Sequence, residues 1–315
     1  MKKIIAILIA LILLTLPVFA GHEPEANMGN VAYTIQKYAE KPVIDGILDE
    51  YSYTKLDVKP GDISYGWSDS VTNGADLAKN LDFAAYLTYD EDYVYLFLSV
   101  DAANYFNDIE TFGDGNMWAQ SIIQANFAAV TDAGGDRLEY GIGRNSINGE
   151  LNYICWAQYP GAAAELNLQP GTDFQIVVTG GRLNYEVRTP VAAFTANGKL
   201  AEGGQIGFCL VIGMCDKSLA EGQAAGGYLH TQVASGCSGG KAADQFAKIT
   251  LAGVMEGRPV IVEEVEVVEE PADVGTPAVT PPSGGAAQTG DSYIAILIMV
   301  IAVTGVVVFR RKAVR

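Results

Sequence analysis

The clearest pattern in the chain is a pair of hydrophobic segments, 83–89 and 93–100, joined by the acidic turn 90–92. In the second segment, aliphatic residues alternate with aromatic ones: Val94, Leu96, Leu98 and Val100 against Tyr93, Tyr95 and Phe97. Successive residues of a strand point to opposite faces. The pattern therefore predicts a β-hairpin that is covered on both faces.

Further segments of four to eight residues have strand composition and are separated by Gly, Asn and Asp. They are 122–128, 137–143, 151–157, 174–178, 183–188, 205–212 and 228–233. No long amphipathic helix pattern competes with them, and the 35 glycines fit many turns. We expect an all-β domain over 31–252, folded as a two-sheet antiparallel β-sandwich of the immunoglobulin or jelly-roll type.

Composition and charge narrow the function. The chain has 315 residues, of which 49% are hydrophobic, so it can bury a full core. Its 37 acidic and 20 basic residues give a net charge of −17, which repels phosphate backbones and anionic lipid. Nucleic acid is therefore not an expected partner, whereas cations and neutral ligands remain open. With only His22 and His230, a His-rich zinc site is excluded.

The N-terminus has the features of a signal peptide. Two lysines precede a long apolar run, and Pro17 is followed by Val18-Phe19-Ala20, which places small residues at positions −3 and −1 of a cleavage site. We expect residues 1–20 to be removed on export. The alternative is an uncleaved membrane anchor, and both interpretations export the chain.

The C-terminus predicts a membrane anchor. Residues 293–309 carry no charge and, at about 17 residues, are near the lower limit for a transmembrane helix. Four basic residues follow, Arg310, Arg311, Lys312 and Arg315, and should stay in the cytoplasm. We expect 292–315 to be a transmembrane helix with a basic tail and the domain to lie outside the cell. A buried core helix is the alternative, but no later segment could pack around it.

Residues 256–290 form an acidic, Pro- and Gly-rich linker that cannot bury enough apolar surface to fold alone. It ends in Thr289-Gly290, and the order of Thr-Gly, apolar helix and basic tail resembles the sortase sorting signal of Gram-positive surface proteins. Ala286 and Ala287 stand where that signal has Leu and Pro. The resemblance implies that a sortase cuts between Thr289 and Gly290 and links the protein to the cell wall; otherwise the helix itself is the anchor.

Five segments occur in an order that resembles family 9 carbohydrate-binding modules, part of the DOMON-like group of β-sandwiches. They are VIDGILDEYSY at 43–53, YDEDYVY at 89–95, MWAQ at 117–120, LNYEVRTP at 183–190, and GQIGFCLVI at 204–212 with Asp216 after it. The resemblance spans nearly all of 31–252. It implies the same sandwich that the alternation predicts, and a non-catalytic protein that binds a carbohydrate.

In that family, two tryptophans clamp a terminal sugar. Trp118 matches the first, Gln124 falls where the family has a polar strand residue that reaches the sugar, and Ser121 replaces the usual Asp. The arginine of the middle strand is missing, with Arg144 close enough in sequence to replace it. The second tryptophan has no match, because residues 234–241 contain no aromatic side chain.

Trp67, Trp156 or Tyr159 could supply the second ring if they fold over the same cleft. Trp67 lies in a Gly-, Ser- and Asp-rich stretch, 61–73, which we interpret as an exposed loop. Trp156 lies in a predicted strand, where a core position is the alternative. Trp118 has its own alternative, because a tryptophan at the start of a strand can simply close the end of the sandwich. We therefore expect a shallow site for a neutral glycan or a glycan end.

Two other features carry candidate chemistry. Asp90 and Asp92 lie in a tight turn close to further acids, and a structural calcium is one interpretation, with a solvated turn as the alternative. Four cysteines allow three pairings. Cys209 and Cys215 are too far apart along one strand to bridge, so Cys215–Cys237 is the expected disulfide if one forms; buried thiols are the alternative.

Catalysis has no clear signature. Residues 236–240 satisfy Gly-x-Ser-x-Gly, but the only nearby histidine, His230, precedes the string instead of following it. A redox module is the rival function, because some DOMON-like domains hold haem through Met and His, and His230 could pair with Met117 or Met214. A surface or adhesion protein that has lost its sugar site is the third interpretation.

Overall fold

The computed structural model describes residues 30–69, 80–103, 105–110, 113–129, 136–215, 228–238 and 241–258, with only the backbone given for 65–69. The predicted signal peptide, the transmembrane segment and the sorting signal at Thr289 and Gly290 lie outside the described residues, as does the linker beyond residue 258. Within the described ranges, no helix is both long enough and apolar enough to cross a membrane.

The described domain is built from strands and four short 3-10 helices. The strands are β1 (Ala32–Lys37), β2 (Thr54–Lys55), β3 (Ile63–Asp69), β4 (Phe83–Tyr89), β5 (Tyr93–Asp101), β6 (Ile122–Ala128), β7 (Leu138–Arg144), β8 (Leu151–Ala157), β9 (Phe174–Thr179), β10 (Arg182–Pro190), β11 (Gln205–Cys215), β12 (Tyr228–Val233) and β13 (Ala247–Val254). The helices are η1 (Pro60–Asp62), η2 (Gly115–Ala119), η3 (Val191–Ala193) and η4 (Ala243–Gln245). Every strand predicted from the sequence is confirmed to within three residues at each end; β1, β2, β3 and β13 were not predicted.

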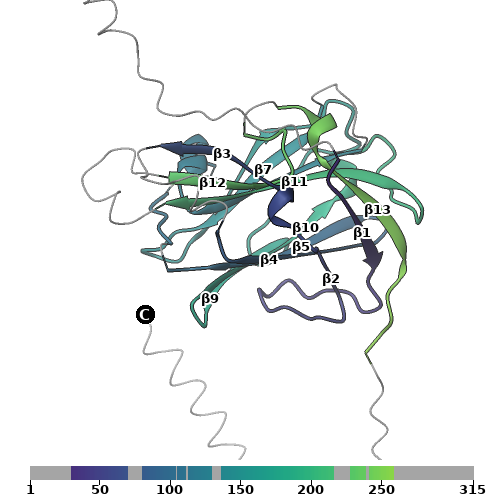
Figure 1. Ribbon diagram of the computed structural model, residues 1–315, viewed down its shortest axis with the longest axis horizontal. Coiled ribbons are helices and arrows are strands. Elements are labelled where there is room, and N and C mark those ends of the chain that lie inside the picture. Colours follow the sequence, from purple (N-terminus) through teal and green to yellow (C-terminus); the bar gives the residue numbers. More distant parts are fainter. Residues whose placement is uncertain are drawn as a thin grey trace, which may run out of the picture. The chain divides into compact units, whose positions relative to one another are not determined.

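The strands form one continuous 13-stranded sheet that folds over into two layers joined through β11 (Figure 1), so the two sheets expected from the sequence are connected into one. One layer, which we call the first sheet, runs β8-β7-β6-β11-β12-β3. The second sheet runs β13-β1-β4-β5-β10-β9, with β2 paired to β4. The first half of β11 pairs with β13 and the second half with β12, so the sheets are joined by hydrogen bonds. The all-β prediction is confirmed, but the antiparallel one is only partly right, because β1 runs parallel to both β13 and β4.

The main core lies between the two sheets. The first sheet contributes Ile123, Ala125, Phe127, Tyr140, Ile142, Phe208, Leu210 and Ile212, and the second contributes Val94, Leu96, Leu98 and Val100. These four aliphatic residues of β5 are the face predicted from the alternation. The aromatic face of β5 packs separately, with Tyr95 and Phe97 against Tyr53. Both faces of the hairpin are therefore covered, as predicted.

The segment 43–53 covers that aromatic face and is fixed by one buried carboxylate. Glu186, on β10, accepts hydrogen bonds from the backbone amides of Asp45 (2.9 Å) and Gly46 (2.8 Å) and from the Tyr53 hydroxyl (2.7 Å). Gly46 has φ +79° and approaches Val177 so closely that a Cβ there would lie 2.6 Å from its Cγ2. The motif that begins the family resemblance therefore has a structural role here.

Removing one donor to this carboxylate should destabilise the fold. Burial raises the pKa of Glu186, and the hydrogen bonds from Tyr53 and the two amides oppose that rise. In Tyr53→Phe the buried carboxyl loses one partner, so we expect the free energy of unfolding to fall by about 1–3 kcal/mol. Chemical denaturation at neutral pH measures this change. Tyr51→Phe, at an exposed tyrosine of the same segment, is the matched control, and equal stability of the two variants would contradict the expectation.

Candidate functional site

Polar side chains gather on the face of the first sheet that points away from the core, which we call the outer face. Strand register places Gln124, Gly141, Val211 and Gln232 in one row across β6, β7, β11 and β12. The next row carries Ile122, Gly143, Gly213 and His230. The outer face is covered at one end by η2 and at the other by residues 235–238 and 241–246. The candidate site lies where these two coverings meet the sheet.

Helix η2 is fixed to the sheet by its two ends. Asp114 caps its start, accepting from the Asn116 amide at 2.8 Å. At its end, a Cβ on Gly213 would lie 2.8 Å from the Gln120 carbonyl oxygen, so the chain can approach β11 this closely only because residue 213 is glycine. Ser121 follows, and its hydroxyl accepts from the amides of Phe106 and Cys215. The Ser121 hydroxyl therefore connects the end of η2 to β11 and does not face a ligand.

Trp118 is presented by η2 with its ring half-buried. Its carbonyl oxygen lies 2.8 Å from Nε2 of His230, which is buried on β12. Its ring meets the Tyr228 ring edge-on, with centroids 5.1 Å apart and planes at 86°. Residues of one strand, β12, therefore contact both the backbone and the ring of Trp118. The partial burial of Trp118 fits both interpretations, a surface for a ligand and a tryptophan that closes the end of the sandwich.

Trp156 is tied to the same helix. Its Nε1 donates to the Gly115 carbonyl oxygen at 3.2 Å, and it packs with Met117, Ile122 and Ile154. The register of β7 and β8 shifts between Glu139 and Tyr140, which leaves Trp156 as the extra residue of a bulge. A Cβ on Gly141 would lie 2.5 Å from Cη2 of Trp156, so the indole lies directly on the glycine. Trp118 and Trp156, far apart in sequence, are brought to one helix.

The contact between Trp156 and Gly141 gives a direct test of this packing. In Gly141→Ala the new methyl group overlaps the indole, so the ring must move off β7 and lose its bond to Gly115. We expect a loss of about 1–3 kcal/mol in unfolding free energy and a shift in tryptophan fluorescence. Gly115→Ala, where a Cβ meets no atom within 4 Å, is the control. An unchanged emission spectrum in Gly141→Ala would show that the ring does not lie there.

Gln124 is on the outer face but is only 5% exposed. Cys237 lies over it, with Sγ 3.6 Å from Oε1 of Gln124 and 3.8 Å from Oε1 of Glu139. Glu139 also binds Lys241 at 2.7 Å and Arg137, whose Nε donates at 3.0 Å. A sugar can therefore reach Gln124 only if the segment around Cys237 moves. The Lys241 side chain, which pairs with Glu139, is exposed.

The segment above Gln124 is held by a short polar chain. Gln232 donates to the Ser64 hydroxyl at 2.7 Å and accepts from the Ser238 amide at 2.9 Å. Ala234 and Lys241 adopt left-handed backbone conformations, φ 64° and 49°, and are the only non-glycine residues of the described ranges to do so. Such conformations cost about 1–3 kcal/mol each and are frequent at functional sites.

The structure places two further predicted site residues differently from the sequence prediction. Trp67 is not in a loop: it belongs to β3, where residues 66 and 67 form a bulge opposite His230, the residue that bonds to the Trp118 carbonyl. The Gly- and Ser-rich composition hid a strand that is stabilised by pairing with β12. Arg144 ends β7, three residues beyond Gly141 and hence on the other face, and its guanidinium packs on Gly149 in the β7–β8 turn. Arg144 therefore does not lie on the outer face with Gln124 and Gly141.

His230 has a structural partner that argues against haem. A carbonyl oxygen only accepts, so the neutral ring donates from Nε2 to Trp118. Burial lowers the pKa of His230 to about 4; the bond to Trp118 opposes this, and the charge of Lys241 adds to it. Met214 pairs with Leu229 and lies on the core face, opposite His230, while Met117 is buried against Trp156. Neither predicted Met–His pair can ligate one haem in this arrangement.

The acidic turn of the hairpin is held by hydrogen bonds. Asp90 accepts from the hydroxyls of Tyr38 (2.7 Å) and Tyr95 (3.1 Å) and from the amides of Asp92 (2.8 Å) and Tyr93 (2.7 Å). Burial alone would raise the pKa of Asp90, but these bonds hold it below its usual value. Asp92 forms an ion pair with Lys199. Among the described residues there is no group of three or more candidate metal ligands, so the calcium interpretation has no support here.

The cysteines are all thiols, so the expected Cys215–Cys237 disulfide is wrong. Cys215 ends β11 opposite Tyr228, whereas Cys237 packs near the other end of that strand with Cys209 and Val211. The Gly-x-Ser-x-Gly string is not an elbow between a strand and a helix: Ser238 lies in the covering segment, and the nearby histidine is bonded to Trp118.

No protein-family model matches the sequence, and a comparison with curated proteins finds no match. Among solved structures, the chain is similar to a family 9 carbohydrate-binding module from Caldicellulosiruptor kristjanssonii. The complex of that module with cellotriose has TM-score 0.46 and 16% identity and covers 72% of this chain and 100% of the module. Its complex with glucose has TM-score 0.44 and 16% identity and covers 73% and 100%.

Proposed function

We propose that this chain is a non-catalytic carbohydrate-binding protein whose ligand is a neutral glycan or a glycan end. One observation carries the proposal: Trp118 presents a half-exposed indole in an orientation that is fixed before any ligand arrives. Sugars offer an apolar C–H face that packs on a flat ring, and a ring that is already immobilised loses little entropy on binding. The sequence resemblance to family 9 modules, which covers nearly the whole domain, supports the same conclusion.

The remaining groups suit a shallow site. Trp156 is bound to the same helix and is partly exposed, but it lies on Gly141 of β7, three strands from the β12 residues that contact Trp118, so the two indoles are separate apolar surfaces. Lys241, its ammonium paired with Glu139, has an exposed side chain and offers a charged donor to sugar hydroxyls. The net charge of −17 favours a neutral sugar over an acidic one. Gln124 would take part only after the segment around Cys237 moves.

The location of the protein belongs to the same proposal. The signal peptide, the acidic linker and the C-terminal apolar helix together predict a domain that is exported and held at the cell surface. Either a sortase links Thr289 to the cell wall or the helix retains the protein in the membrane. A linker of about 35 residues in extended form reaches on the order of 100 Å, enough to hold the site away from the surface.

A glycan array probed with the full chain, with and without chelator, tests the function. We expect neutral poly- or oligosaccharides to be bound, with the same spots in EDTA, because Asp90 takes its donors from tyrosines and amides and needs no calcium. Loss of binding in EDTA would contradict the interpretation that the Asp90 turn needs no calcium.

A structural or adhesion protein that has lost its sugar site is the second candidate, and the burial of Gln124 favours it. It predicts an empty array in both conditions. That result would contradict the carbohydrate proposal itself, whereas a dependence on chelator alone would not.

A further inference from the structure

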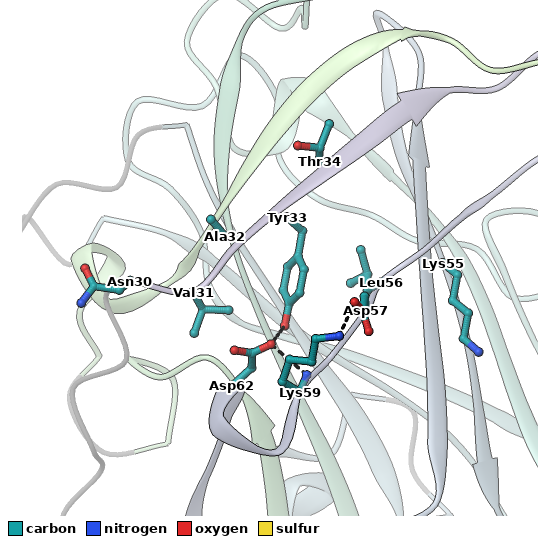
Figure 2. Close-up of a pocket in the computed structure, with 10 residues that line it drawn as sticks. All are labelled: Asn30, Val31, Ala32, Tyr33, Thr34, Lys55, Leu56, Asp57, Lys59 and Asp62. Atoms are coloured by element: carbon teal, nitrogen blue, oxygen red, sulfur yellow. Dashed lines mark hydrogen bonds and ion pairs between the residues drawn. The ribbon is translucent and has the colours of Figure 1, made fainter.

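A second concave region lies between β1 and the segment that leads into β3. It is a pocket of 460 Å³, and Figure 2 shows Tyr33 at its centre, with Asp62, Lys59 and Asp57 around the ring's hydroxyl end. Val31 and Leu56, both buried, supply apolar wall, and Asn30, Thr34 and Lys55 complete the lining. This volume is in the range of small-molecule sites.

The aromatic wall of the pocket is rigid. The Tyr33 hydroxyl donates to Oδ2 of Asp62 at 3.0 Å, and the same oxygen accepts from the Lys59 amide at 2.9 Å. Burial, followed by the charge of Asp62, raises the pKa of Tyr33, which keeps the phenol protonated and donating. Lys59 in turn forms an ion pair with Asp57. The ring is therefore held at both ends, by β1 and by Asp62.

Donors and acceptors alternate around that ring. Asp62 uses Oδ2 for both of its bonds, which leaves Oδ1 as an acceptor. Within the described part of the chain, the side chains of Asn30, Thr34 and Lys55 have no hydrogen-bond partner, so they add donors and acceptors at the rim. Two lysines and two aspartates line the pocket. The lining is thus formally neutral on a chain of net charge −17, which suits an uncharged ligand rich in hydroxyl groups.

The pocket is distant from Trp118. Asp62 immediately precedes β3, whose first residue Ile63 pairs with Val233, whereas Asp69 at the other end pairs with Tyr228, the residue that contacts the Trp118 ring. Six strand steps separate the two ends, which is about 20 Å at ~3.3 Å per residue. One sugar residue cannot contact both places.

We propose that the Tyr33–Asp62 pocket is a second binding site for a neutral sugar residue, independent of the one at Trp118. Asp62 and the rim groups would take the hydroxyls, while the held ring of Tyr33 packs against the apolar side of the sugar. A domain with two such sites would bind two sugar residues at once and could bridge two glycan chains, or two places on one chain.

The test uses the full chain in four forms: wild type, Trp118→Ala, and Trp118→Ala combined with either Asp62→Asn or Glu165→Gln. Glu165 is exposed and lies outside the pocket lining, so its variant is the matched control for loss of a carboxylate. Saturation-transfer NMR with glucose, galactose, mannose and xylose as probes measures binding, and thermal unfolding verifies that each form is folded.

We expect at least one probe to bind Trp118→Ala, with affinity at least fivefold weaker after Asp62→Asn and unchanged after Glu165→Gln. Tyr33→Phe, which keeps the ring but removes the bond to Asp62, should weaken the same probe. Loss of all binding in Trp118→Ala would overturn the second site and leave the proposed function standing. Binding that is unaffected by Asp62→Asn would also overturn it, and a wild type that binds no probe or glycan would overturn both proposals.

Discussion

Trp118→Ala should weaken glycan binding about tenfold or more while changing the free energy of unfolding by less than about 1 kcal/mol. Trp118 is partly exposed, its ring contacts the edge of Tyr228, and it is not a member of the cluster between the sheets. Its removal should therefore leave that core intact. The bond that positions helix η2 comes from the Trp118 carbonyl, which alanine retains. Binding should therefore be lost without unfolding. Isothermal titration with a glycan identified on the array gives the affinity, and urea denaturation gives the stability.

Two variants make that result specific. Trp118→Phe keeps a smaller flat ring and should bind with intermediate affinity. Tyr228→Leu removes the edge contact without touching the proposed platform and should weaken binding less than Trp118→Ala. If Trp118→Ala costs several kcal/mol of stability and leaves affinity unchanged, the indole is a packing residue and the proposed site is wrong.

Acid should destabilise the domain through His230. Its pKa is about 4 in the folded protein and 6.5 in the unfolded chain, so between these values the unfolded state binds more protons. Stability is therefore complete above pH 6.5 and is lost as the pH falls toward 4. The shift corresponds to about 3 kcal/mol. In the folded protein the ring takes up its proton only near pH 4, which puts a charge beneath Trp118, so glycan binding by the folded protein should decline as the pH falls through about 4.

His230→Gln isolates this contribution, because the amide can still donate to the Trp118 carbonyl but does not titrate. Urea denaturation measures the free energy of unfolding at each pH. Between pH 7 and pH 4 this free energy should fall by about 3 kcal/mol less in the variant than in the wild type. Glu186 titrates in both proteins with the opposite sign: its raised pKa lowers stability as the pH rises through that pKa. It therefore cancels in the difference between the two curves. Parallel curves would show that His230 is not the acid-sensitive group.

The sequence predicted those parts of the fold that local pattern determines. The β4–β5 hairpin is an example, because residues 94–100 of β5 each have a partner on β4 across a short turn, and their faces are set by alternation. The same reasoning missed β3. Its sequence is rich in glycine, serine and aspartate, and it becomes a strand through pairing with β12, more than 150 residues away. Pairing over such separations leaves little trace in local composition.

The candidate site was predictable in part. Trp118 was identified from the segment MWAQ, and the structure places it on a helix with accessible surface. Nothing local to Gln124 shows that Cys237, over a hundred residues later, lies on top of it. Arg144 was misplaced for a simpler reason: the parity of its position on β7 puts it on the other face from Gly141, and the strand begins one residue later than expected. The pocket at Tyr33 has no sequence signal, because β1 and η1 meet there only in the folded chain.

For the C-terminal tether that we propose, the position of β13 has a mechanical consequence. Tension in that proposed tether would enter the domain through the residues that follow β13, which ends at Val254 and is extended by the bond of the Met255 amide to the Lys37 carbonyl. β13 is hydrogen-bonded to β1 along one edge and to β11 along the other. When a bound ligand holds the domain, a pull along β13 shears both ladders together instead of opening one bond after another. The tether is thus attached to a strand that resists extraction.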